Sequence, residues 1–185
     1  MKEVLSKLPI ELLTPSWLEI SSEVDESGTT FQENALLKAR HFFRLSDLPT
    51  LADDSGIVVE ALENELGVQT RRYGAGPAAS DQEWIDYFLK RMEGEKNKRA
   101  RFMCCIAYID SSGTEHLFEG QCEGMITPTL EAEYLPGLPI SACFRPDGFD
   151  CVYSAMSIEQ KNSTSHRGKA MGKVREFLRS HLKKC

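Results

Sequence analysis

A chain of 185 residues can bury one sizeable core, and because a domain typically takes about 100 to 200 residues, we expect a single domain over residues 1–185. Hydrophobic residues make up 41% and charged residues 27%, which excludes a disordered chain. The net charge of −6 excludes a broad surface for a nucleic acid polymer, which requires clustered Lys and Arg, but it allows a local basic pocket for a small phosphorylated ligand.

The first 28 residues predict little regular structure. Residues 1–8 read as part of a short helix that stops at Pro9, and residues 10–13 as a brief strand. The polar and acidic segment 19–27 reads as a loop that ends at Gly28.

The pattern of residues 30–46 predicts a helix. Thr30 and Glu33 have the spacing of a capping box, and apolar side chains then recur on one face up to Ser46. A short run, 50–52, leads into the adjacent carboxylates of LADDSG, and 57–62 alternates as a half-buried strand does.

The middle of the chain predicts a helix followed by two strands. Ser80 and Glu83 form a second capping box, and the helix it opens carries inward-facing Trp84, Tyr87, Phe88 and Met92. The segment EGEKNKRAR reads as a charged linker. Residues 101–126 read as an antiparallel pair joined by the turn DSSGTE.

Residues 127–153 are rich in Pro and Gly, and we expect loops there. Ser157 and Gln160 cap a short helix, and a final helix begins at Arg167. Because helices and strands interleave and at least one strand pair is antiparallel, the fold class is α/β with a mixed sheet flanked by helices.

No apolar run approaches the ~20 residues that span a bilayer, and the stretch MKEVLSKLPIELL lacks the apolar core and cleavage site of a secretory signal. We therefore expect a cytoplasmic protein with no membrane partner. The six cysteines include no CxxC pair, and Cys104 and Cys105 are neighbours, so we expect reduced thiols.

The adjacent carboxylates Asp53 and Asp54 admit two interpretations. At the end of a strand they would point into a crevice where ligands of open α/β sheets bind, and because successive side chains alternate, one would hold a metal or activate water while the other stands beside it. Asp, Ser and Gly are also turn formers, so the same stretch is equally typical of a turn.

A basic cluster lies in EQKNSTSHRGKA, where Lys161, His166, Arg167 and Lys169 gather at the start of a helix. Helix N–H groups attract anions and the Arg fork matches phosphate oxygens, although a solvated basic face would show the same pattern. Together with the carboxylates, this cluster predicts a site for a Mg²⁺-bound polyphosphate, because Mg²⁺ prefers carboxylates, phosphate oxygens and water.

Five motifs occur in a specific order: TFQENALLKA (30–39), LADDSG (51–56), RRYGAG (71–76), RARF (99–102) and EQKNSTSHRGKA (159–170). In this order they resemble the inosine triphosphate pyrophosphatase family, hydrolases of deaminated purine nucleoside triphosphates. The resemblance runs over about residues 3–178. It implies an elongated α/β fold with two lobes around a cleft, a long mixed sheet and a homodimer.

The reaction that the resemblance implies is attack of water on the α-phosphorus of ITP, dITP or XTP with Mg²⁺, which gives the monophosphate and pyrophosphate. Asp54 would be the general base and a metal carboxylate, with Asp53 beside it as a metal ligand or a neighbour of one. The substrate would contact Ser55, Arg72, Lys161, His166 and Arg167. A further acidic ligand before the capped helix would be Glu23, Asp25 or Glu26.

The chain also departs from the family pattern. Members begin with a strand and a loop that grips the triphosphate, whereas this sequence starts at a segment that matches the helix after them, so the first strand is expected to be missing. In GLPISACF (137–144), Leu138 and Ile140 replace aromatics that would flank the base, and Ser141 replaces an Asp. These departures leave a second hypothesis open, a catalytically feeble relative that binds nucleotides or other proteins.

Overall fold

The computed structural model describes residues 2–63, 65–68, 73–74, 76 and 78–182. The chain divides into two compact units. The first consists of Met1–Ser55, Cys104–Gly120 and His166–Cys185, and the second of Gly56–Met103 and Gln121–Ser165.

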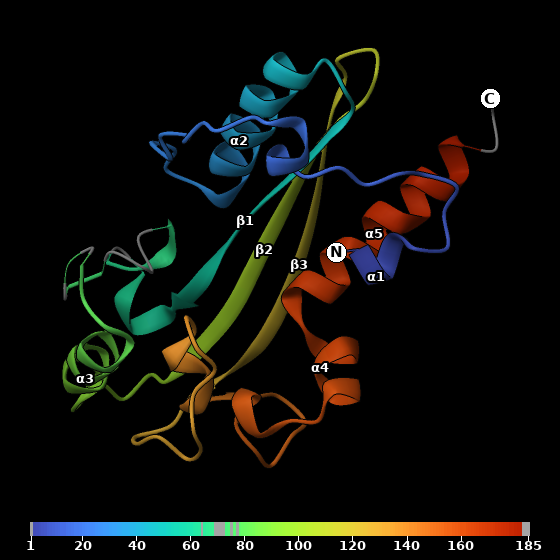
Figure 1. Cartoon of the computed structure of the whole chain (residues 1–185). Helices are drawn as coiled ribbons and strands as arrows, with labels where there is room; N and C mark the ends of the chain where they lie inside the picture. Colours follow the sequence, from blue (N-terminus) through green and yellow to red (C-terminus); the bar gives the residue numbers. More distant parts are fainter. Residues whose placement is uncertain (1, 64, 69–72, 75, 77, 183–185) are drawn as a thin grey trace. The chain divides into compact units, whose positions relative to one another are not determined.

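Four described strands form one sheet in the order β1-β2-β3-β4. They are β1 (Thr50–Val59), β2 (Arg99–Ile109), β3 (Glu115–Ile126) and β4 (Phe144–Pro146). β3 pairs antiparallel with β4, and β1, β2 and β3 alternate in direction (Figure 1). The α/β class with helices flanking a sheet is confirmed, but the described strands are antiparallel where we expected a mixed sheet.

The described helical elements of the first unit are α1 (Lys2–Leu5), η1 (Pro15–Leu18), α2 (Phe31–Ser46) and α5 (His166–His181). As predicted, the side chain of Thr30 caps α2 by accepting a hydrogen bond from the backbone of Glu33. The apolar core of this unit forms where α5 packs with α1 and with residues of β2. Its buried members are Leu5, Cys104, Ile106, Ala170, Met171, Val174 and Leu178.

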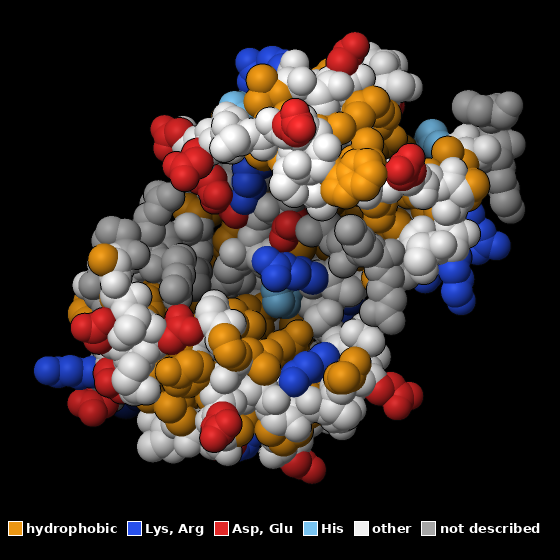
Figure 2. All heavy atoms as spheres, in the orientation of Figure 1, with side chains coloured by type: hydrophobic (Ala, Val, Ile, Leu, Met, Phe, Trp, Pro, Cys, Tyr) orange, Lys and Arg blue, Asp and Glu red, His pale blue; other side chains and the backbone are white. Residues whose placement is uncertain are grey.

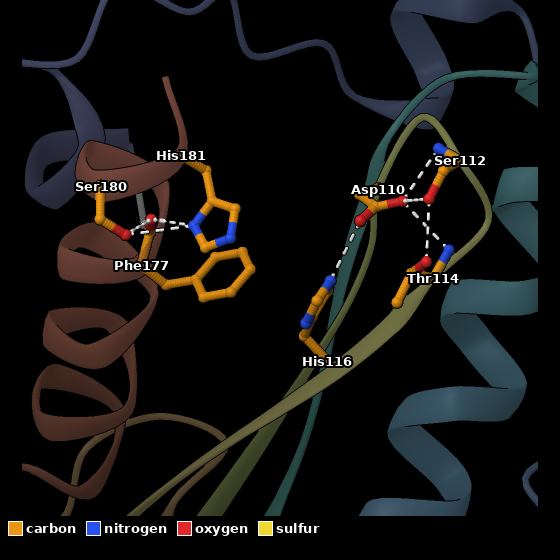
Figure 3. A network of polar contacts seen from close by, with 7 residues as sticks. All are labelled: Asp110, Ser112, Thr114, His116, Phe177, Ser180 and His181. Atoms are coloured by element: carbon orange, nitrogen blue, oxygen red, sulfur yellow. Dashed lines mark hydrogen bonds and ion pairs between the residues drawn. The ribbon is translucent and has the colours of Figure 1, made fainter. Parts of the chain in front are cut away.

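The predicted hairpin between β2 and β3 is confirmed. The carboxylate of Asp110 stabilises its turn through hydrogen bonds (Figure 3). Oδ1 of Asp110 accepts hydrogen bonds from the Ser112 backbone at 2.9 Å, the Ser112 hydroxyl at 2.6 Å and the Thr114 backbone at 3.0 Å. Its Oδ2 lies 3.1 Å from His116, whose ring contacts Phe177 of α5. These contacts tie the hairpin to the last turns of α5.

The second unit holds η2 (Glu60–Leu62), α3 (Asp81–Met92), η4 (Pro139–Ala142), η5 (Tyr153–Ala155) and α4 (Ile158–Thr164). Both predicted capping boxes, at Ser80 and Ser157, are present. The core of this unit is aromatic: Trp84 stacks on Phe88 at 5.3 Å, and Phe102 meets Phe144 edge-on at 4.6 Å. Trp84, Phe88 and Met92 are buried as predicted, but Tyr87 is 41% exposed.

Three expectations about strands are wrong. Residues 10–13 form no strand. We expected a strand at 57–62, but β1 begins earlier, at Thr50, and includes both carboxylates. It ends at Val59, and the short helix η2 follows. β4 lies in the segment that we expected to be loop, and its three residues are too few for a periodic pattern.

The described cysteines, Cys104, Cys105, Cys122, Cys143 and Cys151, are free thiols, as expected. Among the described residues, no helix is both long and apolar enough to span a membrane. On the face shown in Figure 2, the described Lys and Arg side chains are scattered among acidic ones and form no continuous basic surface.

Candidate functional site

The adjacent carboxylates lie inside β1, and neighbouring residues of a strand point to opposite faces. The carboxylate of Asp54 meets Lys38 of α2, whereas that of Asp53 meets Arg167 of α5. The turn interpretation is therefore wrong, and the two carboxylates point apart as the alternation predicts, each toward a different helix. The division of their roles stays a prediction.

Asp54 belongs to a cluster with Lys38 and Glu26, which we call the Asp54 cluster. Nζ of Lys38 lies 2.9 Å from Oδ1 of Asp54 and 3.4 Å from Oε2 of Glu26. The helix α2 presents Lys38 toward β1, and the loop before α2 supplies Glu26. Two carboxylates from different segments thus converge on one cationic nitrogen.

Burial raises the pKa of Asp54, because removal from water disfavours the charged form of a carboxyl group. The hydrogen bond and the charge of Lys38 act in the opposite direction, and the neighbouring charge of Glu26 raises the pKa further. A carboxylate whose pKa is raised in this way accepts a proton more readily than a solvated one.

The Asp54 cluster also has the chemistry of a magnesium site. Mg²⁺ is typically held by one or two protein carboxylates together with phosphate oxygens and waters, and Asp54 and Glu26 provide such a pair. Of the three acidic residues that sequence left unresolved, Glu26 is the one in ionic contact with Lys38. No group of three or more His, Cys, Asp or Glu that could hold a metal occurs among the described residues.

A second set of contacts surrounds Asp53. Its Oδ2 lies 3.3 Å from Nε of Arg167, and the same nitrogen lies 3.4 Å from the hydroxyl of Ser55. The Arg167 side chain remains 64% exposed. The structure thus brings together Asp53, Ser55 and Arg167, three of the residues predicted from sequence.

The sequence predicts that His166 contacts the substrate. In the structure the His166 side chain is only 7% exposed. Burial lowers its pKa to about 4, and the positive charges of Arg167 and Lys169 act in the same direction. Its helix start lies against the backbone of β3: a Cβ on Gly120 would stand 2.1 Å from the carbonyl oxygen of His166. Glycine at position 120 therefore permits this close approach, and α5 can begin beside β3.

Of the remaining predicted substrate residues, Lys161 belongs to the second unit. Nζ of Lys161 donates a hydrogen bond to the carbonyl of Ser154 at 2.9 Å and lies 6.0 Å from the centre of the Tyr153 ring. Arg72 lies outside the described residues.

Segment 137–144, which departs from the family pattern, packs within the second unit. Ile140 is 1% exposed and Ser141 is fully buried. The Ser141 hydroxyl accepts a hydrogen bond from the backbone of Leu135 at 3.0 Å. In the described structure these side chains fill the core and close a turn.

Sequence reasoning missed Lys38, although the residue stands in the quoted motif TFQENALLKA. Its spacing offered a signal: Lys38 falls four residues after Asn34, and residues four apart share one face of a helix. What the sequence alone could not show is that this face meets Asp54.

The chain matches the model of the Ham1 family over residues 1–177. It is 39% identical over 180 residues to a dITP/XTP pyrophosphatase of Leptospira interrogans, with 97% of this chain and 90% of the relative covered. A dITP/XTP pyrophosphatase of Aquifex aeolicus is 35% identical over 189 residues, with the same coverage of 97% and 90%.

Solved structures agree with this result. The Ham1 protein of Staphylococcus aureus superposes with a TM-score of 0.88 at 30% identity, and that of Coxiella burnetii with a TM-score of 0.89 at 31% identity. In both cases 97% of this chain and 91% of the other are covered. The resemblance inferred from five motifs is confirmed, and the chain belongs to the Ham1 family.

Proposed function

We propose that this protein is a nucleoside triphosphate pyrophosphatase that hydrolyses the deaminated purine nucleotides ITP, dITP and XTP to the monophosphate and pyrophosphate with Mg²⁺. The observation that carries the proposal is the Asp54 cluster, in which two carboxylates and one ammonium converge. The relatives named dITP/XTP pyrophosphatase support the substrate class.

Asp54 would act as the general base. Water attacks the α-phosphorus, its proton passes to the Asp54 carboxylate, and the bond from the α-phosphorus to the bridging oxygen breaks to release pyrophosphate. The raised pKa of Asp54 suits this transfer. Lys38 orients the carboxylate through its 2.9 Å contact and adds positive charge where phosphate charge accumulates.

Asp54 and Glu26 would hold the Mg²⁺ ion. When bound, the ion would neutralise phosphate charge and polarise the phosphoryl oxygens. Asp53 remains a predicted metal ligand or neighbour of one, and its contact with Arg167 supports the second role, because the carboxylate is already engaged in orienting a cation.

Arg167 and Ser55 would contact the substrate, with the exposed guanidinium of Arg167 offering a fork that matches phosphate or base oxygens. His166, Lys161 and Arg72 stay predictions as substrate contacts. For His166 the burial favours a neutral ring that supports the start of α5. A homodimer and a cytoplasmic location also stay predictions.

A second function has a specific observation in its favour. Ile140 and Ser141 are buried where the resemblance would place groups that recognise the base. A protein with such a change could bind triphosphates without turning them over efficiently.

A nucleotide panel separates the two functions. We expect pyrophosphate release from dITP, ITP and XTP that is at least tenfold faster than from dATP and ATP, and that stops when EDTA removes Mg²⁺. If no triphosphate is split at any Mg²⁺ concentration while ITP still raises the melting temperature, the pyrophosphatase proposal fails and the nucleotide-binding function replaces it.

A further inference from the structure

Helix α2 faces the Asp54 cluster with a second polar side chain one turn before Lys38. Asn34 is 2% exposed, which is unusual for a polar residue in the first turn of a helix. Buried polar side chains are usually hydrogen-bonded, so the partner of Asn34 indicates what the residue does.

The oxygen of the Asn34 amide faces the acidic loop. Its Oδ1 accepts a hydrogen bond from the backbone N–H of Gly28 at 2.8 Å, two residues after Glu26. A Cβ on Gly28 would stand 2.5 Å from this oxygen and 2.8 Å from Cβ of Glu33. Only glycine therefore lets the loop approach the helix this closely.

Asn34 thus joins the loop that carries Glu26 to helix α2. Lys38, four residues later on the same face of α2, forms ion pairs with Glu26 of that loop and with Asp54 of β1.

We propose that Asn34 is a positioning residue, which fixes the acidic loop at Gly28 so that Glu26 reaches the same cation as Asp54. This inference rests on the proposed function and adds to it a residue that would touch neither substrate nor metal. Loss of Asn34 frees the loop two residues after Glu26.

Two substitutions test this contact. Asn34→Ala removes the hydrogen bond from Gly28, whereas Asn34→Asp keeps an oxygen that can accept it. Gln32→Ala is the matched control: Gln32 lies in the same turn of α2 and donates its side-chain hydrogen bond to Glu119, outside the Asp54 cluster.

The first readout requires no activity. Amide hydrogen exchange measured by NMR should show the Gly28 N–H protected in the parent, in Asn34→Asp and in Gln32→Ala, and at least tenfold less protected in Asn34→Ala. Equal Gly28 protection in the parent and in Asn34→Ala would overturn the proposal, whether or not the protein hydrolyses nucleotides.

The second readout is steady-state kinetics with dITP at a series of Mg²⁺ concentrations. We expect Asn34→Ala to lose at least tenfold in kcat and to need more Mg²⁺ for half-maximal rate, while Gln32→Ala keeps the parent values. Parent-like kcat and Mg²⁺ dependence in Asn34→Ala, with the parent active, would overturn the positioning role. An inactive parent would overturn the proposed function instead, and the Gly28 exchange would still test the loop contact.

Discussion

At the scale of single residues, the site depends on which partner each side chain of β1 meets. Asp54 is buried and faces a lysine, whereas Asp53 faces an exposed arginine. Since exposed ion pairs contribute only about 0 to 1 kcal/mol, the contact between Asp53 and Arg167 is better explained by orientation of the guanidinium than by stability.

Replacement of this guanidinium gives a prediction for binding. We expect Arg167→Ala to raise KM for dITP about tenfold or more with a smaller change in kcat, because the lost contact would serve substrate binding. Steady-state kinetics measure both constants. Arg175→Ala is the control, because it removes an exposed arginine of the same helix that pairs with its neighbour Glu176. An unchanged KM in Arg167→Ala would remove Arg167 from the substrate site.

Sequence could predict some of these residues and not others. The alternation of side chains in an extended segment was enough to predict that Asp53 and Asp54 point apart. Glu26 could not be chosen over Glu23 and Asp25, because a loop carries no periodic pattern that places its side chains. The contact of Lys38 with Asp54 joins residues 16 positions apart in different elements, so it depends on tertiary packing.

At the scale of elements, the sequence predicted those helices and turns that depend on residues close together in the chain. Capping boxes and apolar spacing predicted α2 and α3, and the turn residues between β2 and β3 predicted the hairpin. The sequence predicts two separate segments, 50–52 and 57–62, in place of β1, because the acidic residues between them are typical of a turn. Its contacts with residues of α2 and α5 override this local preference.

The first turn of α5 gives a prediction about pH. The pKa of His166 is lowered from 6.5 to about 4, so between these values the unfolded chain binds a proton that the folded protein excludes. The contribution of His166 to stability is therefore complete above pH 6.5 and is lost as the pH falls toward 4. The loss is on the order of 3 kcal/mol.

We test this with His166→Gln, which cannot be protonated. Urea unfolding at a series of pH values should show that the parent loses more free energy of unfolding than the variant between pH 7 and pH 4. Parallel curves for the two proteins would show that His166 does not titrate as described.

At the scale of the whole molecule, each unit has its own apolar core, and the Asp54 cluster and the contacts of Asp53 both lie within the first unit. Sequence predicted the α/β class and the family, because motifs in a specific order identify a fold more securely than any single element does. It did not predict the direction of every strand, since pairing between distant segments leaves little trace in local pattern.

The central claim is that Asp54 drives hydrolysis and is not required for folding. Because burial already raises the pKa of this carboxylate, its replacement by a neutral amide of similar shape should leave the fold intact.

The most direct test is the rate of pyrophosphate release from dITP with Mg²⁺ by the parent and by Asp54→Asn, together with both melting temperatures. We predict at least a thousandfold loss of kcat, on the order of 4 kcal/mol in activation free energy, with a melting temperature close to that of the parent. An Asp54→Asn variant that folds and releases pyrophosphate at nearly the parental rate would contradict the account.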